Sequence, residues 1–187
     1  AESYSERIAV KIRTLELLSV IDMLCLVILI VIQTLAAMKM SVLNKLLEQR
    51  AYTDAHTGLP NKDACEVLIN NKETVAKHTA CIMFDLNNLK IINDTKGHSK
   101  GDQLILNFAR FLRNIIPKEA FVGRYGGDEF MVVIYNTSKT EIEDILKQLS
   151  REKDRLNSSG NNMPIDYACG WAISDADSEC TIQMLLD

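Results

Sequence analysis

Apolar residues form one unbroken run near the start of the chain and return later in short periodic groups. Leu17 to Met38 reads LLSVIDMLCLVILIVIQTLAAM, and Asp22 is its only charged residue. About 20 apolar residues can cross a bilayer as a helix, and this run is apolar on every helical face. We therefore expect residues 1–38 to be a hydrophobic, membrane-spanning helix with a short charged lead. Asp22 and Gln33 favour the alternative, a buried or coiled-coil helix of a soluble dimer.

An amphipathic stretch follows this run. Its apolar residues recur at spacings of three and four in Met40, Leu43, Leu47 and Ala51. That spacing gives one apolar stripe on a helix. We expect residues 39–53 to be a helical stalk that pairs with its copy in a dimer, and a plain surface helix is the alternative. The segment DAHTGLPN, residues 54–61, then ends the helix with a glycine and a proline.

Helical and strand patterns alternate over residues 54–187, which we expect to form one domain. Apolar residues at helical spacing predict helices at 63–77, 100–116, 140–156 and from 181 onward. Short apolar runs between polar residues predict strands at 79–86, 121–125, 129–135 and 165–173. This order, with one central hairpin, predicts an α/β (α+β) sandwich in which helices flank a mostly antiparallel sheet.

Composition narrows the class of protein. The 187 residues are 47% hydrophobic and 25% charged, a globular rather than a disordered balance. The net charge of -4 argues against a nucleic-acid partner, because proteins that bind the phosphate backbone are usually basic. The five cysteines are odd in number and lack metal-ligand spacing, so we expect free, buried thiols in a reducing compartment.

Acidic residues fall at the ends of predicted strands. Asp85 lies near the end of one strand, and Asp128 and Glu129 occupy the turn of the predicted hairpin. If these strands are neighbours, the carboxylates converge at one edge of the sheet and provide the oxygen ligands that Mg²⁺ (or Mn²⁺) prefers. Gly126 and Gly127 leave room for a large ligand to approach the backbone. An ordinary hairpin turn is the alternative explanation for Gly-Gly-Asp by itself.

Three motifs surround these residues. They read DAHTGLPNK at 54–62, DLNNLKIINDTKGHSKGD at 85–102 and RYGGDEF at 124–130. The last resembles the signature loop of the GGDEF-domain diguanylate cyclases. The other two resemble that family's patterns D-x-L-T-G-L-P-N-R and D-x-D-x-F-K-x-x-N-D-x-x-G-H-x-x-G-D. The motifs occur in family order, and the resemblance covers about residues 52–187.

The resemblance implies a fold, a reaction and a metal. The fold would be like a nucleotide cyclase or polymerase palm. Two GTP molecules, one on each subunit of a homodimer, would condense into cyclic di-GMP with loss of two pyrophosphates, which is nucleotidyltransferase chemistry. By position, the carboxylates of Asp85 and Asp128 and the carbonyl of Leu86 would hold Mg²⁺.

The resemblance also assigns the remaining site residues. Asp128 and Glu129 would belong to the catalytic centre, together with Lys90, which would steady the phosphates as a point charge. The GTP-binding residues would be Asn93, His98, Asp102, Gly126 and Gly127. Asn93 and Asp102 would hydrogen-bond the guanine edge, and His98 would line the same pocket.

The chain departs from the family pattern at several positions. Asn87 replaces the second Asp of D-x-D, Leu89 replaces Phe, and His56 replaces Leu. Residues 117–120 read PKEA where many relatives carry the inhibitory product-binding motif R-x-x-D, so product inhibition through that site is not expected. The family's last helix normally continues past Asp187 to a phosphate-binding Lys and Arg. We therefore expect this chain to be short at its C-terminus.

Two other functions compete with the cyclase. A degenerate member of the family could bind GTP as a receptor without turnover, or a membrane signalling scaffold could use the domain only for dimerisation. In each case we expect attachment to the inner (cell) membrane with the catalytic domain in the cytoplasm. Residues 1–16 are too short to form a sensor, so any sensor would lie upstream or on a partner.

Overall fold

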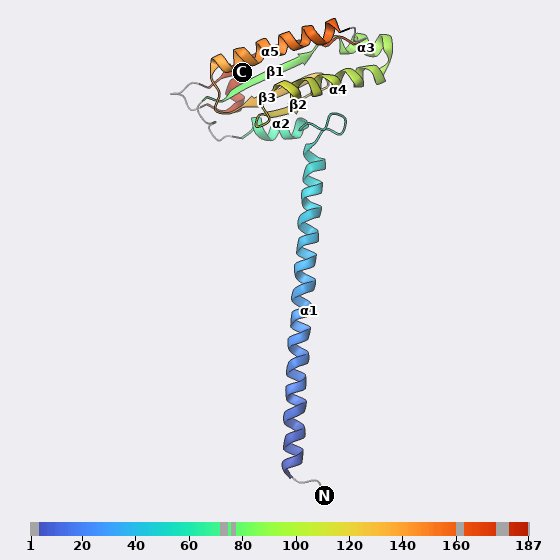
Figure 1. Cartoon of the computed structure of the whole chain (residues 1–187), viewed down its shortest axis with the longest axis vertical. Helices are drawn as coiled ribbons and strands as arrows, with labels where there is room; N and C mark the ends of the chain where they lie inside the picture. Colours follow the sequence, from blue (N-terminus) through green and yellow to red (C-terminus); the bar gives the residue numbers. More distant parts are fainter. Residues whose placement is uncertain (1–3, 72–74, 76–77, 160–162, 175–179, 187) are drawn as a thin grey trace. The chain divides into compact units, whose positions relative to one another are not determined.

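The computed structural model describes residues 4–71, 75, 78–159, 163–174 and 180–186 (Figure 1). The chain divides into two compact units, one ending at Glu48 and the other beginning at Gln49. The second unit carries all three motifs.

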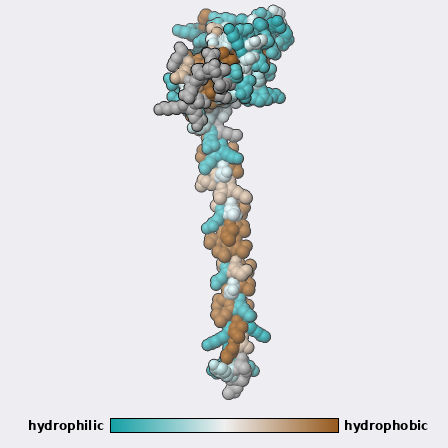
Figure 2. Space-filling model, turned by 90° about the vertical axis from the view of Figure 1, so that its left-hand side faces the viewer, coloured by the Kyte–Doolittle hydropathy of each residue, from teal (hydrophilic) through white to brown (hydrophobic). Residues whose placement is uncertain are grey.

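Helix α1 begins at Tyr4 and continues without a break to Tyr52, so it forms the first unit and its last four residues belong to the second. Its 49 residues span roughly 70 Å at about 1.5 Å per residue, so the predicted hydrophobic segment and stalk share one helix. Its apolar side chains are exposed, with Leu26 at 58% and Leu43 at 48%. Brown, hydrophobic side chains dominate the middle of α1 in Figure 2. By length and composition alone, α1 is the one helix among the described residues that could cross a membrane.

The second unit is a four-stranded sheet with helices on both faces. In chain order its elements are α2 (Lys62–Ile69), β1 (Ala80–Leu86), α3 (Leu89–Lys96), α4 (His98–Ile115), β2 (Phe121–Arg124), β3 (Glu129–Ile134), α5 (Lys139–Ser158), β4 (Tyr167–Ile173) and α6 (Ile182–Leu186). The strand order is β2-β3-β1-β4, and every neighbouring pair is antiparallel. The predicted fold class, an antiparallel-rich sheet flanked by helices, is confirmed.

Alternation along the strands divides the core into two layers. On one face, the even-numbered residues of β1 and β3 pack against α4 and α5, and Phe108 of α4 lies 5.0 Å from Phe130 and 6.1 Å from Phe84 between ring centroids. On the other face, Cys81 and Met131 pack with residues of α2 and α6. The central strands β1 and β3 are therefore buried on both sides, which explains their continuous apolar runs.

Two local predictions were wrong. The helix predicted at 63–77 ends at Ile69, where the C-cap Asn70 donates its backbone N–H to the Glu66 carbonyl; residues 72–74 and 76–77 lie outside the described residues. Helix α3 was not predicted. It is a single short helix between Asn88, which has a φ of 66°, and Gly97, so its apolar residues are too few to show a helical period.

The cysteines are all free, as expected, but not all are buried. Cys65, Cys81 and Cys180 are buried, whereas Cys25 and Cys169 are exposed. Burial raises the pKa of the Cys81 thiol to about 12 and that of Cys65 to about 11. The Cys65 and Cys81 thiols therefore stay protonated at neutral pH and act as small apolar core residues.

A substitution of Phe108 tests the core layer between the sheet and helices α4 and α5. Besides Phe84 and Phe130, its ring packs against Tyr167 at 5.5 Å, so truncation leaves a cavity in the middle of an aromatic cluster. We expect Phe108→Ala to lower the free energy of unfolding by about 3–5 kcal/mol. The matched control is Val67→Ala on α2, because Val67 is 60% exposed. Denaturant unfolding of both variants measures the difference, and equal values would contradict this assignment of the core.

Candidate active site

The antiparallel register of β1 and β3 brings the acidic segments together at one edge of the sheet. Asp85 near the end of β1 is directly opposite Glu129, the first residue of β3. The Leu86 backbone N–H donates to the Asp128 carbonyl over 2.9 Å, which ties the hairpin turn to the end of β1. Paired residues of an antiparallel ladder point to the same face, so the Asp85 and Glu129 carboxylates are neighbours.

This acidic edge is open to solvent. Asp85 and Glu129 are exposed and Asp128 is half-buried. A shallow hollow of about 250 Å³ lies beside Asp85 and Glu129, and the small residues Ala168 and Gly170 of β4 line it on the other side. Like charges placed directly opposite each other destabilise a sheet, so the edge favours a bound cation.

The donor set fits a cation shared with a ligand rather than one enclosed by protein. Among the described residues, no group of three or more His, Cys, Asp or Glu side chains is arranged to hold a metal ion by itself. Mg²⁺ usually takes only one or two carboxylates and completes its shell with water and phosphate oxygens. Asp85 and Asp128, with backbone carbonyls nearby, match that requirement.

Arg124 binds the backbone of the hairpin turn. Its Nε donates to the Gly126 carbonyl over 3.1 Å and its Nη2 donates to the Gly127 carbonyl over 2.9 Å. A Cβ at Gly126 would meet the end of the Glu129 side chain, which would have to shift, whereas a Cβ at Gly127 would meet nothing. The space beside Gly127 is consistent with its predicted role of leaving room for a ligand.

Asp54 links the segment after α1 to this turn. Its carboxylate accepts from Thr57 N over 2.8 Å and Thr57 Oγ1 over 2.6 Å, and it pairs with Arg124 Nη1 at 3.2 Å. Burial alone would raise the pKa of Asp54, but the Thr57 hydrogen bonds and the Arg124 charge outweigh burial and hold that pKa below its ordinary value. The quoted motifs contained both residues, but sequence reasoning assigned no role to either.

Helices α3 and α4 form a second part of the site. Asn93 of α3 is half-buried against Gly101 of α4, where any Cβ would collide with the Asn93 amide. Among the described residues, Asn93 Oδ1 is the one buried side-chain oxygen or nitrogen without a hydrogen-bond partner. An unpaired buried acceptor is costly, so Asn93 is suited to receive a donor from a ligand.

The other predicted site residues of α3 and α4 are Lys90, His98 and Asp102, and all three are exposed. His98 and Asp102 lie one turn apart on α4, and Lys90 lies in the first turn of α3, which directly follows β1 (Figure 1). No hydrogen bond or ion pair within the described chain joins Lys90 or His98 to the acidic edge. The grouping of Lys90 and His98 with the acidic edge therefore stays a prediction.

Two departures from the family pattern make specific contacts. His56 Nε2 lies 2.8 Å from the Asp102 carbonyl and donates to it in the tautomer with a proton on Nε2. Asn87 donates from Nδ2 to Asp166 Oδ2 over 3.0 Å and from its backbone N to the Asp166 carbonyl over 2.9 Å. Asn87 thus faces the segment before β4, away from Glu129.

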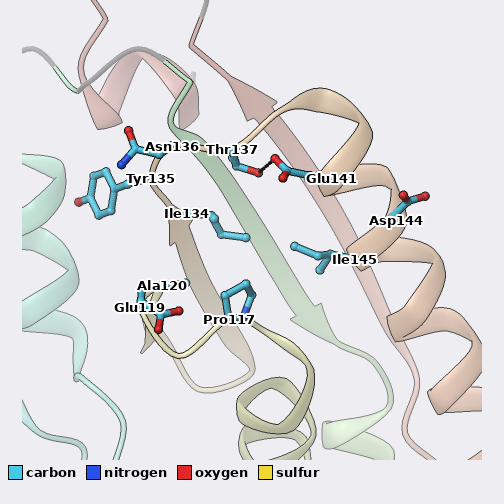
Figure 3. A pocket seen from close by; sticks show the side chains of 10 residues that line it. All are labelled: Pro117, Glu119, Ala120, Ile134, Tyr135, Asn136, Thr137, Glu141, Asp144 and Ile145. Carbon is cyan, nitrogen blue, oxygen red and sulfur yellow. Dashed lines mark hydrogen bonds between the residues drawn. The ribbon is translucent and has the colours of Figure 1, made fainter.

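A wider hollow of about 600 Å³ lies at the opposite end of β3 (Figure 3). Residues that occupy the family's product-binding position line it, including Pro117 and Glu119. Carboxylates of Glu141 and Asp144 lie across the opening, and Thr137 Oγ1 donates to Glu141 over 3.3 Å. Three carboxylates disfavour an anionic dinucleotide, so this hollow is not the site of phosphate chemistry.

Asp54 gives a test of the pairing with Arg124. A carboxylate with a lowered folded-state pKa stabilises the fold above its unfolded pKa, near 3.8, and that stability is lost as the pH falls through the folded pKa. We expect Asp54→Asn to cost about 1–3 kcal/mol at pH 7 and to flatten the loss of stability below about pH 4. Thermal unfolding from pH 7 to pH 3 measures both effects. Asp144→Asn is the control, because its pair with Lys147 is exposed and should contribute little.

Comparison with known proteins identifies the fold and its family. The family model described as "Diguanylate cyclase, GGDEF domain" matches residues 51–187. Diguanylate cyclase DgcN of Escherichia coli (strain K12) is 30% identical over 158 residues, which are 80% of this chain and 38% of that protein. Cyclic di-GMP phosphodiesterase PdeR of the same organism is 35% identical over 101 residues, 53% of this chain and 15% of that protein. The chain spans well under half the length of the curated relatives it matches.

The solved structures agree with the family match. A microbial GGDEF domain, whose structure describes its interaction with cyclic di-GMP, superposes with a TM-score of 0.58 and 26% identity, covering 71% of this chain and 83% of that one. The match extends over more than half of the chain and includes the acidic edge, the hairpin turn and helices α3 and α4. The chain therefore belongs to the GGDEF-domain family of diguanylate cyclases.

Proposed function

We propose that the chain condenses two molecules of GTP into cyclic di-GMP and two pyrophosphates as a homodimer. The observation that carries this proposal is the register that sets Asp85 opposite Glu129 and ties Asp128 to Leu86 at one open edge. We infer the reaction from the family to which the chain belongs, and the acidic edge provides the carboxylates that this reaction needs.

The acidic edge would bind the metal and the phosphates. Asp85, Asp128 and the Leu86 carbonyl would hold Mg²⁺ (or Mn²⁺), and Glu129 would add negative charge beside it. When bound, the metal lowers the pKa of the attacking 3′-hydroxyl and offsets charge on the leaving pyrophosphate. Lys90 would steady the triphosphate as a point charge, and its solvent exposure leaves its ammonium free to reach the phosphates.

Helices α3 and α4 would select guanine. The unpaired Asn93 Oδ1 can accept from an N–H of the base, and the exposed Asp102 carboxylate can accept from guanine N1–H and N2–H₂. Adenine has neither donor at these positions, so the buried Asn93 Oδ1 would be left unpaired, the Asp102 carboxylate would lose its partners, and ATP would be disfavoured. His98, one turn from Asp102, would line the same pocket.

We also propose that α1 anchors the protein in the inner (cell) membrane and leaves the catalytic unit in the cytoplasm. The apolar run from Leu17 to Met38 is long enough to span the hydrocarbon core. Its side chains are exposed in the structure, so lipid or another helix would cover them. A sensor could then act on α1 from an upstream segment or a partner.

A receptor that binds GTP without turnover is the second candidate. PdeR, a similar protein over 53% of this chain, is named for a phosphodiesterase activity, so the domain occurs in proteins not named as cyclases. The same carboxylates could bind GTP and metal without catalysing condensation. The two candidates differ in their product and not in their ligand.

Product analysis separates the cyclase from the receptor. We expect the full chain, solubilised as a dimer and incubated with GTP and Mg²⁺, to form cyclic di-GMP that mass spectrometry detects. Asp128→Asn should lower the rate at least about 100-fold, because it weakens the carboxylate ligation that positions the metal. Asp144→Asn is the matched control, because Asp144 lies in an exposed pair with Lys147 beside the hollow at the opposite end of β3. GTP binding without product in the parent chain would favour the receptor.

His56 gives a test of base recognition. Its hydrogen bond holds the Asp102 carbonyl, so we expect His56→Leu to weaken GTP binding several-fold, although leucine is the family's residue. His56→Gln keeps an N–H donor and should retain most of the affinity. Titration calorimetry with GTP and Mg²⁺ measures the three proteins. In an Asp102→Ala background the effect of His56→Leu should vanish; an undiminished effect would show that His56 acts elsewhere.

A further inference from the structure

The wider hollow at the end of β3 has an apolar floor. Pro117 lies before β2, Ile134 ends β3 and Ile145 lies in the second turn of α5. Their side chains point toward the middle of the hollow (Figure 3). Ile134 and Ile145 also belong to the core layer around Phe108, so the core holds the floor in place. At about 600 Å³, the hollow is as large as many ligand sites.

The rim of the hollow carries negative charge without a matching cation. Glu119, Glu141 and Asp144 line it, and none of its lining residues is a lysine, arginine or histidine. Asp144 pairs with Lys147 over 2.9 Å, so its charge is already offset. Glu119 has no ion pair or side-chain hydrogen bond within the described residues. Glu119 and Glu141 therefore provide the two carboxylates on the rim that no cation of the described chain neutralises.

Glu141 is oriented by the start of α5 and still has a free oxygen. Its Oε2 accepts from Ser138 N over 2.7 Å, from Ser138 Oγ over 3.0 Å and from Thr137 Oγ1 over 3.3 Å. The Ser138 backbone hydrogen bond, followed by the Ser138 hydroxyl, lowers the pKa of Glu141, so the group stays ionised at neutral pH. Its Oε1 receives no donor from the described residues. The carboxylate is thus fixed in place with one oxygen open to a partner.

We propose that this hollow is a docking site for an arginine-containing segment of a partner protein. An arginine side chain has an apolar stem and a charged head, and the hollow has an apolar floor and an anionic rim. The stem would lie on Pro117, Ile134 and Ile145, and guanidinium groups of the segment would donate to Glu119 and to Glu141 Oε1. Guanidinium suits such a site better than ammonium, because it is less strongly hydrated and can bind a carboxylate through two N–H groups.

A protein segment fits this hollow better than a free small cation or an anionic ligand. Both rim residues are exposed, and an exposed ion pair contributes little by itself, so a free cation would gain too little here. A segment adds the apolar contacts of the arginine stem and brings several guanidinium groups at once. A ligand with phosphate groups would be repelled by the rim.

Fluorescence anisotropy of a labelled peptide on the full chain, in a non-ionic detergent, tests the proposal. The probe peptide carries three arginines separated by alanines, and its counterpart has citrulline at the same places, which removes the charge and keeps the shape. We expect the arginine peptide to bind at least about tenfold more tightly. Equal affinities of the two peptides would overturn the proposal. Binding of free arginine amide as tight as that of the peptide would also overturn it, in favour of a small-molecule site.

Matched variants locate the bound peptide. We expect Glu119→Lys to weaken binding of the arginine peptide several-fold, because it places a positive charge on the rim. The control is Asp154→Lys, because Asp154 is exposed on the same α5 but does not line the hollow. Equal losses in these two variants would show that the peptide responds only to net charge, and would contradict the proposal.

Asp128→Asn separates this docking from the proposed reaction. The acidic edge and the hollow lie at opposite ends of β3, so we expect this variant to bind the arginine peptide as the parent chain does. Binding that is lost in Asp128→Asn and kept in Glu119→Lys would place the peptide on the acidic edge and overturn the proposal. The readout is binding alone, so its failure would leave the proposed cyclase activity untouched.

Discussion

The candidate site depends on the register between β1 and β3. Because side chains alternate along a strand, the register that sends Phe84 and Phe130 into the core also sends Asp85 and Glu129 to the other face. A slip of one residue would turn the carboxylates toward the core layer around Phe108 and move the phenylalanines to the opposite face of the sheet. The aromatic layer around Phe108 therefore stabilises the site geometry as well as the fold.

The register carries a cost that a bound cation would remove. Opposed like charges on neighbouring strands destabilise a sheet, and the Asp85–Glu129 pair has no cation from the described chain against it. Arg124 is close along the sequence, but it binds Asp54 and the carbonyls of Gly126 and Gly127. The hydrogen bonds of Arg124 thus fix the backbone of the turn, but they leave the negative charges of Asp85 and Glu129 without a neutralising partner in the described chain. Such an arrangement favours a ligand that brings its own positive charge, as a metal nucleotide does.

The sequence predicted the parts of this architecture that have a local signature. The apolar runs predicted the four strands, and the places of Asp85 and Asp128 at strand ends predicted that they share one edge if the strands are neighbours. Two contacts could not be predicted, because they join residues far apart in the chain: Asp54 with Arg124, and His56 with Asp102. The packing of Asn93 against Gly101 is closer in sequence, but it depends on the angle between two helices, which no local pattern specifies. Helix α3 was missed for a different reason, since eight residues between two turns carry too little periodicity.

Each unit of the chain carries a feature that the residues within it leave unaccounted for. The second unit has one acidic edge, whereas the proposed reaction joins two nucleotides. Helix α1 exposes an apolar surface over its middle, which lipid or another helix would cover. Asp22 and Gln33 lie in this apolar segment, and polar side chains are costly in lipid, so they are the residues of the helix that an apolar surrounding explains least.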